Sequence, residues 1–382
     1  MRTLYLHIGF HKTGSSSLQL ALKRYAQQLK AMGFEFLGLG KKGNSSGAVE
    51  VFKRGERVYF QLNQRLDMLL ASSTGERAIV SAEHLCFLHL RRDIEQVHTI
   101  CSNYFDDIRV VIYLRRQDLQ AVSFKKQSAR GCALNMSSSS KLLGHSEGAF
   151  PRIDDNIKIY YDYFAKLQLW ERVFGKASLT IRGFSSEALR GGDILSDFST
   201  FLGGDLAIPH CRVNEGIGRK QFLLTHKLLE LGVAESEIKK LKPAMAGDKT
   251  VLKPSRSAAV DFFMQFKQSN QQLNDHYLQH GSGLAFNDNF SSYPVRGNDR
   301  LCSQDLAAWV PELFSAGVQA PEGLRDTLLI GRIKALLAEK LKDAALAEEL
   351  KGLAQCLAST AHIAQVREPW YRLLKGRKRS GR

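Results

Sequence analysis

Short apolar runs alternate with amphipathic stretches along the first half of the chain. The apolar runs predict five strands, the first from Leu4 to its break at Gly9 and the others at residues 34–37, 78–81, 109–114 and 178–182. The run at 109–114 is rich in β-branched residues and almost uninterrupted, as in a strand buried on both faces. Strands that alternate with helices predict an α/β fold, with a parallel sheet flanked by helices.

The amphipathic stretches predict the helices between these strands. Their apolar residues recur at intervals of three and four, which is the spacing of one helix face. The predicted helices cover residues 18–32, 61–71, 91–104, 118–128, 156–174 and 193–202. The fifth of these contains a run of aromatic residues at helical spacing, namely Tyr160, Tyr161, Tyr163, Phe164 and Trp170. We expect this run to lie in the core rather than to form a platform for a sugar.

Two regions depart from the alternation. Residues 131–150 are small, polar and Ser-rich, which is typical of a lid loop over a site or of a disordered segment. Beyond residue 215 the pattern becomes helical, at residues 221–233, 257–277 and 325–356. The sequence therefore predicts an α/β core over residues 1–215, a helical region over 216–374 that completes the domain or a substrate site, and a basic tail over 375–382.

The composition is that of a globular protein with an anionic ligand. The chain is 44% hydrophobic and 24% charged, and 54 Lys and Arg against 38 Asp and Glu give a net charge of +16. This charge suits a nucleotide, a nucleic acid, a sulfated or phosphorylated glycan, or an anionic membrane. The six cysteines form no C-x-x-C pair, and no apolar run reaches the roughly 18 residues of a membrane span. We therefore expect a cytoplasmic protein with buried cysteines and no metal site or disulfide framework.

The strongest candidate for chemistry is the loop after the first strand. It combines a lysine, a glycine and several hydroxyls, in the run His11, Lys12, Thr13, Gly14, Ser15, Ser16 and Ser17. A helix follows, and the N–H groups and dipole at its start attract a phosphate. Gly9 and Gly14 have Walker A spacing, but Ser15 stands where a nucleoside triphosphatase needs Lys. The lysine is Lys12 instead, so we expect a phosphate site unlike that of a kinase.

This loop resembles the 5′-phosphosulfate loop of sulfotransferases that use 3′-phosphoadenosine-5′-phosphosulfate (PAPS), particularly bacterial ones with the form H-K-T-G-[ST]-[ST]-S-L-Q. The resemblance implies a P-loop-NTPase-like sulfotransferase core, PAPS as co-substrate and no metal. Lys12 would neutralise the charge that grows on the bridging oxygen, and the rest of the loop would hold the 5′-phosphate. The resemblance is specific over residues 4–20 and 109–128 and loose to about 215, and it does not extend over 216–382.

A second pair of residues matches the same family. Such enzymes bind the 3′-phosphate with an Arg at a strand end and a Ser eight residues later. Arg115 and Ser123 have this spacing, and Arg116 is the alternative if the register slips by one. Arg offers a rigid fork of donors that suits a phosphate. The run Arg212-Val-Asn214 resembles an R-x-N segment near the cofactor in bacterial relatives, and an ordinary loop is the alternative for it.

Sulfuryl transfer also requires a base. Glu83 and His84 follow the third strand, at the carboxyl edge of the sheet where ligands gather. The resemblance implies a base here, which is His in some sulfotransferases and Glu in others. Glu83 follows Ser81-Ala82 as in the S-x-E segment of the family, so it is the first choice and His84 the second. Either needs a pKa tuned by its surroundings, and a plain loop carboxylate or a buried histidine is the structural alternative.

These residues together predict a sulfotransferase that moves the sulfuryl group of PAPS to a hydroxyl, or as a second choice to an amine. A glycan or glycolipid is the predicted acceptor, because such acceptors are usual in the family that the chain resembles and because the basic surface and the 131–150 segment suit a large substrate. A P-loop kinase or nucleotide hydrolase is a weaker alternative because the Walker lysine is missing. A non-catalytic binder of nucleic acid or anionic membrane is the other alternative. Peripheral contact with an anionic membrane remains an expected partner interaction, whereas nucleic acid is disfavoured.

Overall fold

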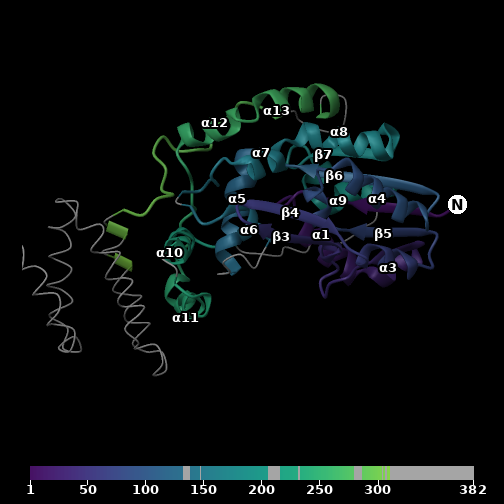
Figure 1. The fold of residues 1–382 in the computed structure, drawn as a ribbon, viewed down its shortest axis with the longest axis horizontal. Coiled ribbons are helices and arrows are strands. Elements are labelled where there is room, and N and C mark those ends of the chain that lie inside the picture. Colours follow the sequence, from purple (N-terminus) through teal and green to yellow (C-terminus); the bar gives the residue numbers. More distant parts are fainter. Residues whose placement is uncertain are drawn as a thin grey trace, which may run out of the picture. The chain divides into compact units, whose positions relative to one another are not determined.

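A parallel sheet of five strands lies at the centre of the fold, as the alternating pattern predicts (Figure 1). The computed structural model describes residues 1–131, 138–146, 148–204, 216–230, 233–278 and 286–302, with 304, 305, 308 and 309. The strand order is β2-β5-β1-β6-β7, and every pairing is parallel. The strands are β1 (Thr3–His7), β2 (Phe34–Leu37), β5 (Arg77–Ser81), β6 (Asp107–Leu114) and β7 (Leu179–Gly183). The α/β fold class is therefore confirmed.

The order of the strands brings the predicted site segments to one edge. β1 pairs with β5 on one side and with β6 on the other, so that His7 lies opposite both Ser81 and Val111. Because the pairing is parallel, the three strands end at the same edge of the sheet. The loop after β1, the segment after β5 and the segment after β6 therefore leave the sheet side by side.

Helices cover both faces of the sheet, because successive strand residues point to opposite sides. Leu4 and Leu6 contribute to one core cluster, whereas Tyr5 contributes to the other. The helices on the first face are α3 (Arg65–Ala71), α4 (Arg91–Ser102), α5 (Gln117–Gly131), α7 (Asp155–Tyr161), α8 (Tyr163–Phe174), α12 (Arg256–Met264) and α13 (Lys267–Leu273). Those on the second face are α1 (Ser15–Arg24), α2 (Ala26–Ala31) and α9 (Ile194–Phe201).

An antiparallel hairpin was missed by the sequence pattern. It consists of β3 (Val49–Arg54) and β4 (Arg57–Leu62), which form a separate two-stranded sheet. The helix predicted over residues 61–71 therefore begins only at Arg65. The hairpin is half-exposed and carries charged residues at its tip, so its apolar alternation is too short to stand out from a polar loop.

Two predicted helices are each broken in the middle. The helix expected over residues 18–32 divides into α1 and α2 at Tyr25, and the one over 156–174 divides into α7 and α8 at Asp162. The Asp162 side chain accepts a hydrogen bond from Ala165 N (3.1 Å) and so caps α8. The aromatic run over these two helices is nevertheless buried, except for the half-buried Phe164, as the spacing predicts.

The segment expected to be irregular contains a helix, α6 (Ser138–Leu143). The role of residues 131–150 as a lid stays a prediction, and residues 132–137 and 147 lie outside the described part of the chain. Short 3-10 turns occur elsewhere: η1 (Ser46–Ala48), η2 (Glu83–Phe87), η3 (Lys176–Ser178) and η4 (Arg190–Gly192). A π-helical turn, η5 (Asn274–Leu278), follows α13.

The chain divides into two compact units. The first contains residues 1–217 and 252–299, and the second contains 218–251 and 300–382. The second unit includes α10 (Arg219–Glu230) and α11 (Glu235–Met245). In the first, α12 and α13 run over α7 and α8 (Figure 1), although the pattern groups them with the C-terminal helices. The helix predicted over 325–356 and the basic tail lie outside the described residues. None of the described helices is long and apolar enough to cross a membrane.

Candidate functional site

The loop after β1 has an unusual backbone. Lys12 and Gly14 both adopt left-handed conformations, with φ of 67° and 79°. A side chain on Gly14 would also crowd Phe184 and Ile194, at 3.1 and 3.2 Å from its Cβ. A left-handed lysine costs free energy, and such strain is concentrated at functional sites. α1 begins at Ser15, and the N–H groups of Ser17 and Leu18 both donate to the Gly14 carbonyl. The N–H groups of Ser15 and Ser16 have no acceptor among the described residues, so they can bind an anion.

Hydrogen bonds within the protein hold this loop in place. The Thr13 hydroxyl donates to the Phe10 carbonyl (2.6 Å), and the Gln120 amide of α5 donates to the His11 carbonyl (2.9 Å). Gly9 allows the loop to pass close to its neighbours, because a Cβ there would lie 2.8 Å from Ser15 Oγ. The loop is therefore preorganised, and the hydroxyl of Thr13 is already used inside it.

The His11 side chain anchors the loop from within. Its ring is buried and stacks on Phe124 with centroids 4.2 Å apart, and its Nδ1 lies 2.8 Å from the Tyr160 hydroxyl. Burial, helped by His84 and Lys12, lowers the pKa of His11 well below its usual range, so the ring is neutral. Its Nε2 is buried and has no hydrogen-bond partner among the described residues.

Glu83 and His84 begin η2, directly beyond the end of β5. Burial raises the pKa of Glu83 to about 7, although the charge of Lys12 and the hydroxyl of Ser15 favour the carboxylate. Lys12, Ser15 and Glu83 therefore lie close enough to interact. Burial lowers the pKa of His84 to about 4, and its backbone N–H donates to Ser46 Oγ (3.2 Å). Of the two candidates, Glu83 is thus the stronger base at neutral pH.

The two candidate arginines, which follow the end of β6, have different surroundings. Arg116 is buried and forms a two-pronged ion pair with Asp118, and it also donates to the carbonyls of Asn287 and Asn289. Arg115 is half-buried and makes no hydrogen bond or ion pair with the described residues. Burial lowers the pKa of Arg115, which indicates a guanidinium that is partly removed from water. Among the described residues, the hydrogen-bond donors of Arg116 are therefore occupied, whereas those of Arg115 are not.

Two further residues beside Arg115 were missed by the sequence reasoning. Burial and the charge of Arg115 lower the pKa of Lys126, so these two cations lie near each other. Lys126 is three residues beyond Ser123 in α5, which places both on one helix face. The hydroxyl of Tyr163, whose ring is fully buried, also interacts with Arg115 and has no hydrogen-bond partner among the described residues. The i, i+3 spacing could have revealed Lys126, whereas Tyr163 carried no signal apart from its place in the aromatic run.

A buried lysine that contacts η2, the turn that begins with Glu83, was also missed. Lys166 Nζ donates to the Cys86 carbonyl in η2 (2.7 Å) and lies 5.0 Å from the centre of the Tyr160 ring. Burial lowers the pKa of Lys166 to about 8. Lys166 therefore fixes η2 against α8, and the only sequence signal was a lysine within an apolar helix face.

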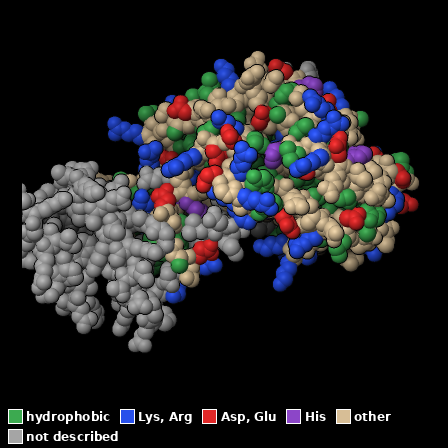
Figure 2. Space-filling view, in the orientation of Figure 1, with side chains coloured by type: hydrophobic (Ala, Val, Ile, Leu, Met, Phe, Trp, Pro, Cys, Tyr) green, Lys and Arg blue, Asp and Glu red, His purple; other side chains and the backbone are tan. Residues whose placement is uncertain are grey.

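Other predicted features stand as follows. Arg212 and Asn214 lie outside the described residues, so their role stays a prediction. Cys86 and Cys101 are buried as expected, whereas Cys302 is exposed, and all three are free thiols. Among the described residues, no three His, Cys, Asp or Glu side chains are grouped as a metal site would need. On the face shown in Figure 2, Lys and Arg side chains lie among acidic ones rather than in one patch.

Comparisons with known proteins give distant similarities. No protein-family model matches the sequence. An uncharacterized protein of Archaeoglobus fulgidus is 25% identical over 192 residues, which are 44% of this chain and 46% of that protein. The match thus spans about half the length of this relative. The crystal structure of a sulfotransferase from Alicyclobacillus acidocaldarius is similar over 72% of this chain and 95% of that one, with 16% identity and a TM-score of 0.38. Similarities of this size do not establish a family, so the functional argument depends on the site residues.

Proposed function

We propose that the protein is a PAPS-dependent sulfotransferase. The observation that carries this proposal is a group of three features at neighbouring strand ends. A donor-rich loop follows β1, an arginine that makes no hydrogen bond or ion pair with the described residues follows β6, and a carboxyl with a pKa near 7 follows β5. Two anion sites beside one titrating carboxyl suit a nucleotide with two separate phosphates and a reaction that removes a proton.

The loop after β1 would bind the 5′ end of the donor. The N–H groups of Ser15 and Ser16 and the hydroxyl of the exposed Ser16 offer hydrogen-bond donors to a phosphate. Lys12 supplies a positive charge in the strained part of the loop. Because the loop is fixed by its own hydrogen bonds, these donors need little reorganisation when charge develops on the leaving phosphate.

Arg115, Ser123, Lys126 and Tyr163 would bind the 3′-phosphate. Two neighbouring cations repel each other and lose hydration when they are partly buried. An anion between them removes the repulsion and supplies acceptors for both side chains. The same anion would give the buried Tyr163 hydroxyl an acceptor. This second site is what distinguishes the donor from an ordinary nucleoside monophosphate or triphosphate.

In the reaction, Glu83 would accept the proton of the acceptor hydroxyl. The oxygen of that hydroxyl would form a bond to sulfur while the bond from sulfur to the 5′-phosphate oxygen breaks. Lys12 would neutralise the charge that appears on this leaving oxygen, and the 3′,5′-bisphosphate would be the second product. A pKa near 7 suits the base, because the group is then more basic than an ordinary carboxylate and about half of it is ionised at neutral pH.

We further propose that the acceptor is a hydroxyl of a glycan or glycolipid, and the β3–β4 hairpin supports this class. The hairpin follows directly on η1, whose Ser46 contacts the backbone of His84. On its outer face, Phe52 and Tyr59 stack with centroids 5.5 Å apart, and Arg54 lies over both rings. Apolar ring faces next to a cation can contact both the carbon face of a sugar and an acidic group on it.

A thermal-shift experiment tests the donor class. Adenosine 3′,5′-bisphosphate should raise the melting temperature, because a ligand of the native state stabilises it by about 2.7 kcal/mol at 100 times its dissociation constant. Adenosine 5′-monophosphate lacks the 3′-phosphate and should give a much smaller shift at equal concentration. A larger shift with ATP and Mg²⁺ than with the bisphosphate would instead indicate a kinase or hydrolase.

The Lys12→Ala variant tests the chemistry on the same preparation. Loss of the charge on the leaving oxygen should lower transfer of labelled sulfate from PAPS by at least about 10²-fold. Lys23→Ala is the matched control, because Lys23 lies in α1, the helix that follows the loop, and its side chain is exposed. Its one hydrogen bond to the described residues is with the Lys41 carbonyl. Normal turnover by Lys12→Ala would refute the proposed mechanism.

A further inference from the structure

A buried ion pair marks the start of α5, directly after Arg115. Arg116 Nε and Nη2 donate to the two oxygens of Asp118, at 2.8 and 2.9 Å. Both side chains are buried, and the Asp118 side chain is fully so. A buried pair of this kind persists only when its remaining donors and acceptors are also satisfied. The partners come from a segment more than 160 residues away in the sequence.

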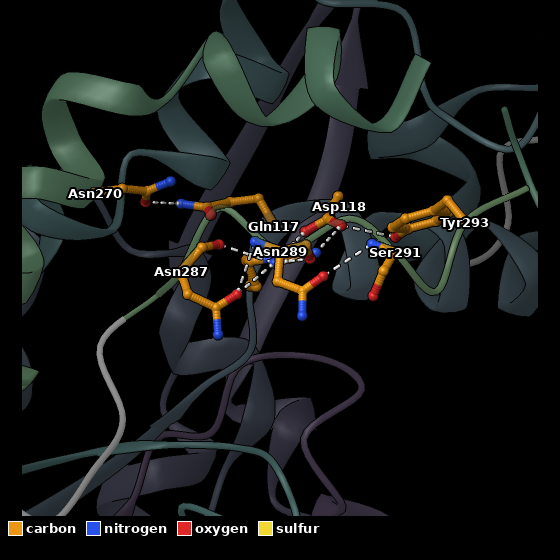
Figure 3. Close-up of polar contacts among 8 residues, drawn as sticks. Gln117, Asp118, Asn270, Asn287, Asn289, Ser291 and Tyr293 are labelled. Atoms are coloured by element: carbon orange, nitrogen blue, oxygen red, sulfur yellow. Dashed lines mark hydrogen bonds and ion pairs between the residues drawn. The ribbon is translucent and has the colours of Figure 1, made fainter. Parts of the chain in front are cut away.

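Residues 286–293 supply those partners (Figure 3). Arg116 Nη1 donates to the carbonyl oxygens of Asn287 (2.9 Å) and Asn289 (2.7 Å), and the guanidinium lies 4.5 Å from the centre of the Phe290 ring. The Tyr293 hydroxyl donates to Asp118 Oδ2 (2.7 Å). The far segment therefore binds both members of the ion pair.

The segment that makes these contacts is itself ordered by local hydrogen bonds. Asn289 N donates to Asn287 Oδ1 (3.0 Å), and Ser291 N donates to Asn289 Oδ1 (2.9 Å). Such Asx turns fix the backbone of polar segments. At its start, Phe286 exchanges two hydrogen bonds with the side chain of Asn274 in η5. The backbone of residues 286–293 is thus held in place by hydrogen bonds, and the segment can serve as a fixed support for the ion pair.

This support decides what Arg115 can bind. Asp118 lies close enough to Arg115 to stabilise its charge, and a carboxylate is the natural partner of an arginine. Yet Asp118 already accepts three hydrogen bonds, two from Arg116 and one from Tyr293. A carboxylate offers about four acceptor positions, so little capacity remains for Arg115.

We propose that Tyr293 and Arg116 are positioning residues. Their hydrogen bonds use the acceptor positions of the Asp118 carboxylate and so keep the Arg115 guanidinium available for the 3′-phosphate. This inference rests on the proposed function, because it concerns how the 3′-phosphate is recognised. None of the three residues Arg116, Asp118 and Tyr293 needs to touch the donor. Their effect is on selectivity for a nucleotide with a 3′-phosphate.

The Tyr293→Phe variant tests this role. It removes one hydrogen bond to Asp118 and keeps the ring, so Asp118 gains an acceptor position that Arg115 can occupy. The dissociation constant of adenosine 3′,5′-bisphosphate, measured by titration calorimetry, should rise about fivefold, the value of one hydrogen bond. That of adenosine 5′-monophosphate should not change, because it has no 3′-phosphate. In turnover, KM for PAPS should rise with kcat unchanged.

Tyr277→Phe is the matched control. Its hydroxyl binds Glu171, away from this network, so the ratio of the two dissociation constants should stay at the wild-type value. An equal loss of both ligands in Tyr293→Phe would mean a purely structural role and would overturn the proposal, as would no change in either. If the unmodified protein binds neither nucleotide, the proposed function is wrong, and the inference about Tyr293 and Arg116 is wrong as well.

Discussion

At the scale of single residues, the pKa of Glu83 is set by two opposing effects, burial and a neighbouring positive charge. Glu83 lies near the positive charge of Lys12, which by itself would lower its pKa, yet burial raises that pKa to about 7. The native protein therefore holds a proton at Glu83 that the unfolded chain releases between about pH 4.5 and 7. This group stabilises the fold below its ordinary pKa, and the stabilisation is lost as the pH rises through 7. The raised pKa thus suits proton transfer near neutral pH, but it lowers the stability of the fold above pH 7.

The pH dependence of turnover should report this carboxyl. We expect kcat/KM to rise about tenfold per pH unit below an apparent pKa near 7 and to level off above it, because only the carboxylate can accept a proton. Glu83→Gln should remove this inflection and lower the rate by about 10²- to 10⁴-fold. His84→Asn is the control and should keep the inflection, since the pKa of His84 lies near 4. An inflection lost in His84→Asn but kept in Glu83→Gln would assign the base to His84.

At the scale of the elements, one buried carboxylate fixes α9, which supports the loop after β1. Asp197 accepts hydrogen bonds from the Tyr113 hydroxyl in β6 (2.7 Å) and from Arg182 in β7 (2.8 Å). Ile194, at the start of the same helix, packs against the place where Gly14 has no side chain. The position of α9 against the sheet therefore shapes the turn at Gly14.

Loss of this carboxylate should be far more costly than loss of one of its partners. Asp197→Ala leaves the Arg182 guanidinium largely buried without an ion pair, so we expect the free energy of unfolding to fall by about 3–5 kcal/mol. Tyr113→Phe removes a single hydrogen bond and should cost about 1 kcal/mol. Urea unfolding measures both, with an unchanged m-value as the sign of intact two-state behaviour. Equal losses in the two variants would show that the ion pair contributes little.

The sequence predicted those elements whose signal lies in a continuous local pattern. The central strands β1, β5 and β6 were found because a strand buried on both faces is a nearly unbroken apolar run. The edge strands β2 and β7 are less buried and were found as short apolar runs between predicted helices. The β3–β4 hairpin was missed because only one of its faces is buried. The breaks at Tyr25 and Asp162 were missed because the apolar spacing continues across them.

In the candidate site, too, local patterns were found from the sequence and contacts between distant segments were missed. The loop around Lys12 and the segments after β5 and β6 were recognisable from their residue types at strand ends. The choice between Arg115 and Arg116 was not, because it depends on Asp118 and on a segment far along the chain. Lys126 was missed because its meaning comes from its proximity to Arg115 in space.

At the scale of the whole molecule, the chain leaves the first unit at residue 217 and returns to it at 252. The returning residues carry a substantial part of the core, since Phe262, Phe266 and Leu273 belong to the cluster on one face of the sheet. They also carry Tyr293, which completes the network at Asp118. A division of the chain at residue 215 would therefore cut through one hydrophobic core.

Truncated chains should show this dependence directly. Residues 1–217 should fail to unfold cooperatively, because the surface covered by α12 and α13 becomes exposed and the Arg116–Asp118 pair loses its satisfied environment. Residues 1–299 contain the whole first unit and should keep both a cooperative melt and the thermal shift with adenosine 3′,5′-bisphosphate. Circular dichroism melts with and without the nucleotide compare the two chains with the full-length protein. A cooperative, nucleotide-stabilised fragment 1–217 would contradict this account, because the α/β core would then be complete without the segment that returns to it.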